Sequence, residues 1–154
     1  MNEKHLQANF QPIGYVYHDT PDTDVSRQRR VLESAIVIEP QYRLALTGIG
    51  DYSHLFVIFW LHESPAPEQL LVHPRGKDEY PLTGLLATRG RSRPNPIGLA
   101  VAELLACNLD AGELRVRRVD AYSGTPILDL KPYDTYDIFE KVSVPPWFSK
   151  NSSR

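Results

Sequence analysis

His54-Leu55-Phe56-Val57-Ile58-Phe59-Trp60-Leu61 is apolar at every position after the first, and this stretch decides the fold. An apolar run of this length predicts a strand buried in a sheet. Thirteen prolines and nine glycines interrupt the rest of the chain, which leaves little room for long helices and favours short strands joined by turns. The predicted strands are Phe10–His18, Val31–Ile38, His54–Leu61, Leu70–His73, Gly84–Thr88, Ile97–Cys107, Glu113–Val119 and Ile127–Leu130.

The segments between these strands predict turns. We expect Ser26–Arg30 in a loop or at a strand start, a short helical turn within Pro40–Ile49, and a proline-stiffened loop over Arg89–Pro96. The fold prediction is therefore all-β (mainly β): a small antiparallel β-barrel with short helical turns and a C-terminal arm that begins at Pro132. At 154 residues, we expect a single domain over residues 1–154.

Composition excludes several classes of protein. The single cysteine, Cys107, leaves no disulfide framework and no cysteine-based zinc site, and it fits a reducing compartment. The five histidines lack the spacing of a metal site, and Ser53, Ser92 and Ser123 lack the context of a hydrolase nucleophile. No apolar run is long enough to cross a membrane, and the N-terminus has no apolar signal core. We therefore expect a cytoplasmic protein with neither a membrane nor a metal partner.

The net charge of −2 conceals an uneven distribution of arginine, which supplies twelve of the seventeen cationic residues. These arginines gather mainly in residues 27–30, 75–93 and 115–118. Arg89, Arg91 and Arg93 alternate, and in an extended segment they would lie about 6.5 Å apart, close to the spacing of successive phosphates. Pairing with acids of the chain or of a partner subunit is the alternative for this cluster. For residues 115–118, a solvated strand face is the favoured interpretation.

Asp120-Ala-Tyr-Ser-Gly-Thr-Pro126 forms a compact polar turn between two predicted strands. An Asx turn that ends a strand is one interpretation. A binding loop is the other, in which Asp120 accepts a hydroxyl or an amine, Tyr122 stacks on a base and Gly124 lets the backbone approach a ligand.

The stretch Ala87-Thr-Arg-Gly-Arg-Ser-Arg-Pro-Asn-Pro-Ile-Gly-Leu99 resembles the signature of the TrmO family of tRNA methyltransferases. Other segments resemble the family and follow in its order along the chain. They are Ile13-Gly14, Ser26-Arg27-Gln28, His54 to His62, Val119 to Pro126 and Asp129 to Tyr133.

This resemblance implies a β-barrel that binds S-adenosylmethionine, works as a homodimer and methylates the N6 of threonylcarbamoyladenosine beside the anticodon of tRNA. The implied cofactor contacts are Ser26, Arg27, Gln28, His62, Glu63, Arg89, Leu99, Val119, Asp120, Ala121 and Tyr122. Asp120 or Tyr122 would receive the proton that leaves the acceptor nitrogen. The implied tRNA contacts are Arg29, Arg30, Arg75, Arg91 and Arg93. Two alternatives stay open: a protein that uses S-adenosylmethionine to methylate another substrate, and a non-enzymatic ligand sensor on the same fold.

Overall fold

The computed structural model describes residues 6–149. The chain folds as two compact units, and each is described by itself. Within the described residues, the first unit comprises residues 6–62 and 97–133, and the second comprises residues 63–96 and 134–149.

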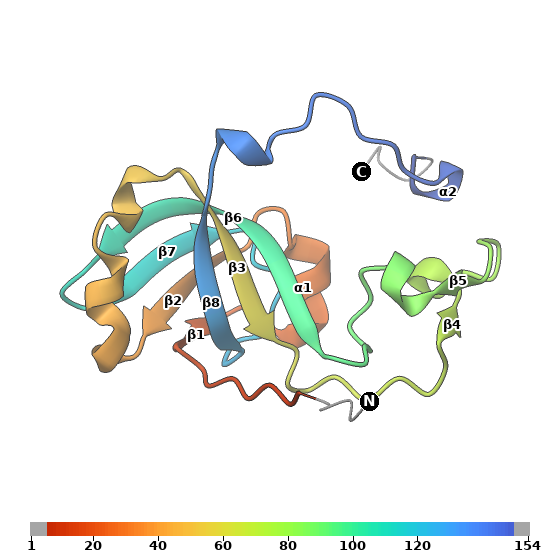
Figure 1. The fold of residues 1–154 in the computed structure, drawn as a ribbon, viewed down its shortest axis with the longest axis horizontal. Helices are drawn as coiled ribbons and strands as arrows, with labels where there is room; N and C mark the ends of the chain where they lie inside the picture. Colours follow the sequence, from red (N-terminus) through yellow and green to blue (C-terminus); the bar gives the residue numbers. More distant parts are fainter. Residues whose placement is uncertain (1–5, 150–154) are drawn as a thin grey trace. The chain divides into compact units, whose positions relative to one another are not determined.

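Six strands of the first unit close into a barrel in the order β1-β2-β7-β6-β3-β8 (Figure 1). All neighbours in the barrel, including the closing pair of β1 and β8, run antiparallel. The all-β prediction of a small antiparallel barrel is therefore confirmed. The strands are β1 (Gly14–Tyr17), β2 (Glu33–Ile38), β3 (His54–Trp60), β6 (Ile97–Asn108), β7 (Glu113–Arg117) and β8 (Pro126–Tyr133).

The barrel interior is filled by every second residue of these strands, as the two-residue period of a strand requires. Leu55, Val57 and Phe59 of β3 point inward and are almost fully buried. The intervening side chains of β3 are half-buried or exposed, and Trp60 is 44% exposed. The apolar run that predicted a buried strand thus has one face in the core and one apolar face on the outer wall.

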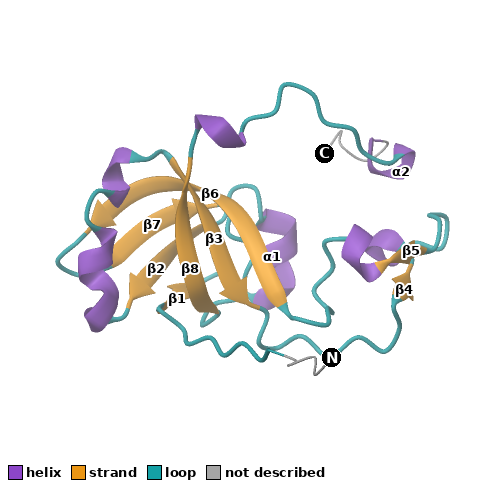
Figure 2. Cartoon of the chain, in the orientation of Figure 1, coloured by secondary structure: helices purple, strands orange, loops and turns teal. Residues whose placement is uncertain are grey.

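One end of the barrel collects the connections that matter for function. Because neighbouring strands are antiparallel, β1, β3 and β7 end at the same rim where β2, β6 and β8 begin. Helix α1 (Asp22–Gln28) connects β1 to β2 at this rim, which we call the α1 rim (Figure 1). The opposite rim carries the 3₁₀ helices η1 (Pro40–Leu46) and η2 (Ile49–Asp51). Figure 2 shows the helical segments of this unit confined to such connections.

Helix α1 corrects the prediction that Ser26–Arg30 lies in a loop or at a strand start. Residues up to Gln28 are helical, with Asp22 and Asp24 in the first turn and Arg27 in the last. These positions complement the helix dipole. Val25 is 1% exposed and anchors the helix to the barrel. A seven-residue helix with one buried side chain carries too little periodicity to be found from the sequence.

The second unit contains only short elements: β4 (Leu71–Val72), η3 (Pro74–Gly76), β5 (Thr83–Gly84), η4 (Leu85–Ala87), η5 (Thr135–Asp137) and α2 (Pro146–Ser149). The predicted strand Gly84–Thr88 is wrong beyond Gly84, because the backbone amide of Thr88 donates to the carbonyl of Leu85 and closes a 3₁₀ turn. The Thr88 hydroxyl donates to the same carbonyl. The predicted start of the C-terminal arm at Pro132 is wrong, because Pro132 and Tyr133 pair with β3 as the end of β8, and the described part of the arm, residues 134–149, belongs to the second unit. Its Trp147 ring lies 5.6 Å from the ring of Tyr80.

Candidate functional site

The α1 rim is held together by backbone hydrogen bonds among three segments of the chain. The carbonyl of Gln28 accepts from the amides of Val31 and Leu32, both at 2.8 Å, which turns the chain from α1 into β2. The carbonyl of Leu32 then accepts from the amide of Arg118 at 2.9 Å. The end of α1, the start of β2 and the loop after β7 therefore form one connected surface.

The loop over residues 118–125 presents its side chains alternately to the core and to the outside. Val119 and Ala121 are buried, whereas Asp120 is exposed and Tyr122 is half-buried. The two buried side chains fix the loop, so that the Asp120 carboxylate stands at the surface of the rim. An exposed carboxylate on a loop fixed by its neighbours is accessible to a ligand, as the binding-loop interpretation of this segment requires.

His18 is a residue of this rim that the sequence analysis missed. Its ring Nε2 lies 2.9 Å from the carbonyl oxygen of Ala121, and its backbone amide donates to the Ser123 hydroxyl at 3.2 Å. With Nε2 as the donor, Nδ1 is a buried acceptor without a hydrogen-bond partner among the described residues. A lone histidine after a strand carries no sequence signal for contacts more than a hundred residues away.

The triplet Ser26, Arg27 and Gln28 lies at the end of α1 with all three side chains exposed. Arg27 meets Asp24 at 3.7 Å, but its side chain is 84% exposed. An ion pair of that length and exposure holds the guanidinium only weakly. These three exposed side chains are therefore accessible to a ligand at the rim.

His62 and Leu99 also belong to the barrel unit. The His62 amide donates to the carbonyl of Trp60 at 2.8 Å, directly after β3, and its ring lies 6.0 Å from the Trp60 ring. Leu99 is paired with Ile58 on the outer wall and is 50% exposed. A ligand that touches Leu99 must therefore reach the outside of β6 near the α1 rim.

The other predicted site residues, Glu63, Arg75, Arg89, Arg91 and Arg93, belong to the second unit. Arg93 is half-buried, and its Nη1 donates to the carbonyls of Leu85, Thr88 and Gly90. Because this donor closes the loop over residues 89–96 on itself, Arg89, Arg91 and Arg93 do not form the row of three equivalent side chains that an extended segment would give. Arg75 adopts a φ of 59° and lies 5.4 Å from the centre of the Phe148 ring.

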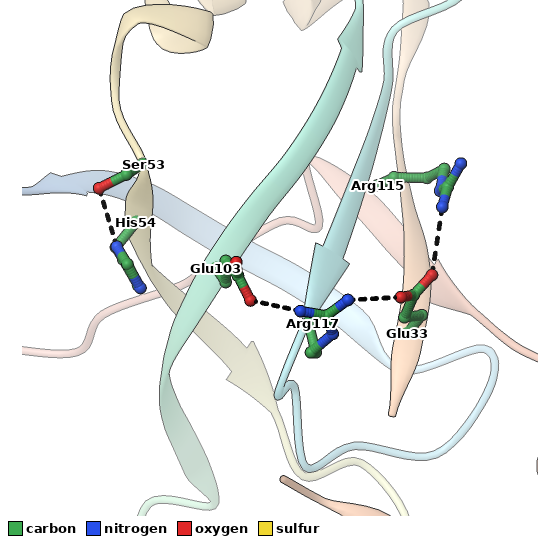
Figure 3. Close-up of polar contacts among 6 residues, drawn as sticks. All are labelled: Glu33, Ser53, His54, Glu103, Arg115 and Arg117. Atoms are coloured by element: carbon green, nitrogen blue, oxygen red, sulfur yellow. Dashed lines mark hydrogen bonds and ion pairs between the residues drawn. The ribbon is translucent and has the colours of Figure 1, made fainter. Parts of the chain in front are cut away.

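Two arginines of the third cluster, Arg115 and Arg117, lie on the outer wall and are paired with acids (Figure 3). Arg117 bridges Glu33 at 2.8 Å and Glu103 at 2.7 Å, and Arg115 meets Glu33 at 3.2 Å. The hydrogen bonds from Arg117 and then Arg115 lower the pKa of Glu33. The prediction of a solvated strand face is confirmed for these two residues.

At the rim opposite α1, the Ser53 hydroxyl lies 2.9 Å from Nδ1 of His54. Figure 3 draws this contact as a dashed line. Glu103 is the cross-strand partner of His54, but its carboxylate binds Arg117. In the part of the chain that the structure describes, no acid is therefore seen to orient this histidine as a hydrolase triad requires.

Three further observations bound the chemistry. A shallow cavity of about 270 Å³ lies within the second unit, lined by Pro65–Gln69, Val72, Leu85 and Ser92, and none of the predicted site residues lines it. Among residues 6–149, no three histidine, cysteine or acidic side chains are grouped to hold a metal ion. Over the same residues, no helix has the length and apolar character needed to span a membrane.

The sequence and the fold both have relatives among known proteins. The family of the tRNA-methyltransferase O N-terminal domain matches residues 17–137. A protein of Methanothermobacter thermautotrophicus described as a probable S-adenosyl-L-methionine-binding protein is 39% identical over 132 residues, which are 83% of this chain and 91% of that protein. The Escherichia coli tRNA (adenine(37)-N6)-methyltransferase is 35% identical over 92 residues, 58% of this chain and 39% of that enzyme.

The crystal structure of TrmO from Pseudomonas aeruginosa superposes with a TM-score of 0.71 at 27% identity. The match covers 90% of this chain but only 61% of that one, so the chain spans less than two thirds of the solved enzyme. The family match covers most of this chain, and the alignment with the archaeal relative covers nearly all of that protein. This chain therefore belongs to the family of the tRNA-methyltransferase O N-terminal domain.

Proposed function

We propose that this protein is an S-adenosylmethionine-dependent methyltransferase that acts on tRNA in the cytoplasm. The observation that carries the proposal is the α1 rim, where α1 and the loop over residues 118–125 are hydrogen-bonded into one surface that bears most of the motif residues. The names of the relatives support the cofactor and the tRNA substrate. The proposed acceptor is the N6 of threonylcarbamoyladenosine beside the anticodon.

The side chains at the rim fit the chemistry of S-adenosylmethionine. The exposed, weakly paired Arg27 suits a carboxylate, and the exposed Asp120 suits ribose hydroxyls or an ammonium group. Tyr122 offers an aromatic face for a base or a sulfonium cation. His18 supports the loop that carries Asp120, because its Nε2 lies 2.9 Å from the carbonyl oxygen of Ala121. The barrel unit therefore supplies groups that suit the carboxylate, the ribose and the base of the cofactor.

The bound group would supply a methyl carbon attached to a positively charged sulfur, open to in-line displacement. What the chain must provide is orientation, because positioning alone contributes several kcal/mol to such a displacement. Val119 and Ala121 hold the loop rigid, and Arg27 with Gln28 would fix one end of the ligand. Asp120 or Tyr122 would take the proton that the acceptor nitrogen loses.

The tRNA contacts are proposed from exposed arginines outside the paired wall cluster: Arg29, Arg30, Arg75 and Arg91, with Arg93 holding the loop that presents Arg91. The remaining motif residues, Ser26, His62, Glu63, Arg89 and Leu99, are proposed to complete the cofactor contacts.

A homodimer is proposed as the assembly. The outer wall of β3 and β6 supports it, because Trp60, Ile97, Leu99 and Val101 are all at least 38% exposed there. A continuous apolar wall of this kind suits a second copy of the chain better than water.

The direct test is transfer of a labelled methyl group from S-adenosylmethionine to tRNA that lacks the modification. The purified chain is expected to label the tRNA. Arg27→Gln is expected to lower the rate at least tenfold, and the matched variant Arg115→Gln, which loses a paired arginine of the outer wall, is expected to keep it. Binding of the cofactor without label in any tRNA would contradict the substrate and favour a different acceptor or a ligand sensor.

A further inference from the structure

Three exposed arginines of the barrel unit make no ion pair or side-chain hydrogen bond within residues 6–149: Arg29, Arg30 and Arg118. The other arginines of this unit all have partners. Arg27 meets Asp24, Arg115 and Arg117 share Glu33, and Arg43 donates to backbone carbonyls.

The backbone gathers the three unpaired arginines at one corner of the α1 rim. The amide of Arg118 donates to the carbonyl of Leu32, and Leu32 itself turns back to Gln28. Arg29 and Arg30 lie between Gln28 and Leu32 in the chain. Since consecutive Cα atoms are about 3.8 Å apart, both lie within roughly 11 Å of Leu32 along the chain, within reach of the long Arg118 side chain. We call Arg29, Arg30 and Arg118 the rim arginines.

Arg118 is held in an unusual conformation, with a φ of 78°. A long side chain at positive φ is disfavoured, and glycine or asparagine would occupy the position more easily. This conformation follows directly after the end of β7 at Arg117, and the Arg118 side chain is exposed and does not share the acids that bind Arg115 and Arg117. An exposed arginine kept at such a position points to a role for its charge.

Two acids near this corner are already paired with other arginines. Glu33 binds Arg115 and Arg117, and Asp24 lies against Arg27. Asp120 lies two residues from Arg118 and is the one nearby carboxylate assigned to the cofactor or the proton. Guanidinium groups whose backbones are gathered at one corner and which form no ion pair repel one another when they approach, and an anion with several oxygens would relieve that repulsion.

We propose that the rim arginines bind successive backbone phosphates of the nucleic acid substrate beside the loop over residues 118–125. Arginine forks match phosphate oxygens, and the corner adjoins the loop that carries Asp120. This inference rests on the proposed function for the identity of the substrate. It adds Arg118, which neither the family signature nor the comparisons assign, and it makes the three side chains one binding surface.

The test measures binding of unmodified tRNA to the full chain as a function of salt. The slope of log K against log[salt] is negative, and each lost phosphate contact reduces its magnitude by about one. The triple variant with Arg29→Gln, Arg30→Gln and Arg118→Asn is therefore expected to reduce the magnitude by about two to three. At low salt its affinity is expected to fall at least tenfold. Asparagine is chosen at position 118 because it tolerates positive φ.

The matched control compares Arg118→Asn with Arg115→Gln, since each removes one positive charge from the β7 region and only Arg115 is paired in the free protein. The magnitude of the slope should fall for Arg118→Asn and stay unchanged for Arg115→Gln. Equal slopes for wild type and the triple variant would overturn the inference, as would wild type that binds no tRNA at low salt.

Calorimetry with S-adenosylmethionine keeps this result separate from the proposed function. The triple variant is expected to bind the cofactor like wild type. Rim-dependent tRNA binding without any methyl transfer would support the rim arginines and refute the methyltransferase. Methyl transfer together with the same salt dependence of tRNA binding in all variants would support the methyltransferase and refute the role of the rim arginines.

Discussion

Gly98 of the Arg-Pro-Asn-Pro-Ile-Gly block is explained by packing, and this gives a quantitative prediction. Gly98 pairs with Phe59 across β6 and β3. A Cβ at position 98 would lie 2.2 Å from Cε2, 2.5 Å from Cζ and 2.6 Å from Cδ2 of the Phe59 ring. Phe59 is only 3% exposed, so its ring has little room to move away.

We expect Gly98→Ala to destabilise the protein. Overpacking of a filled core costs roughly 1–3 kcal/mol, whereas alanine gains only about 0.4–1 kcal/mol by restricting the unfolded chain. The net loss is about 1–2 kcal/mol, which lowers the unfolding midpoint by roughly 2–8 °C in a chain of this size. Urea and thermal unfolding followed by circular dichroism measure both quantities.

Two further variants decide whether the ring is the cause. Gly84→Ala is the matched control, because nothing lies within 4 Å of its Cβ position and its φ of −61° suits alanine. It should leave the midpoint unchanged or slightly raised. In a Phe59→Leu background, Gly98→Ala should cost much less than in wild type. Full stability of Gly98→Ala, or the same cost in both backgrounds, would refute the packing explanation.

Three other outcomes are expected. His18→Ala removes the donor to the Ala121 carbonyl. It should weaken the binding of S-adenosylmethionine several-fold, as measured by calorimetry, and lower the free energy of unfolding by about 1 kcal/mol. Unchanged affinity would show that the ring does not position the loop. The pKa of Glu33 is lowered in the folded state, so its stabilisation is full above the unfolded pKa and is lost as pH falls through the folded pKa. Urea midpoints of wild type and Arg117→Gln should therefore converge in acid, and a constant difference would contradict this. Val101→Lys places a charge on the apolar outer wall and should turn a dimer into a monomer by light scattering, whereas monomeric wild type would refute the assembly.

The barrel could be predicted because its signals are local. The apolar run of β3 and the alternation of β7 each fix a strand without reference to the rest of the chain. Strand ends were less predictable, since they depend on partners. β8 extends to Tyr133 because β3 supplies a pairing partner as far as His54. No local sequence pattern beyond Leu130 predicts this continuation of the strand.

The site was predictable only where a motif carried it. The segments around Arg27 and Asp120 were found by their resemblance to a family, and the structure places both at the α1 rim. His18 and the unpaired state of Arg118 depend on contacts between β1, β2 and the loop after β7, which are far apart in the sequence. The alternation of Arg89, Arg91 and Arg93 wrongly predicted three equivalent side chains, because Arg93 donates to carbonyl groups of its own loop.

The most direct test of the account is a titration of the isotope-labelled chain with S-adenosylmethionine, followed by amide chemical shifts. Within the barrel unit, the largest shifts are expected at residues 26–28, at His62 and at residues 118–122, with little change in η1 and η2 at the opposite rim. Shifts centred on the opposite rim, or none at saturating cofactor, would contradict the claim that the α1 rim is the cofactor site.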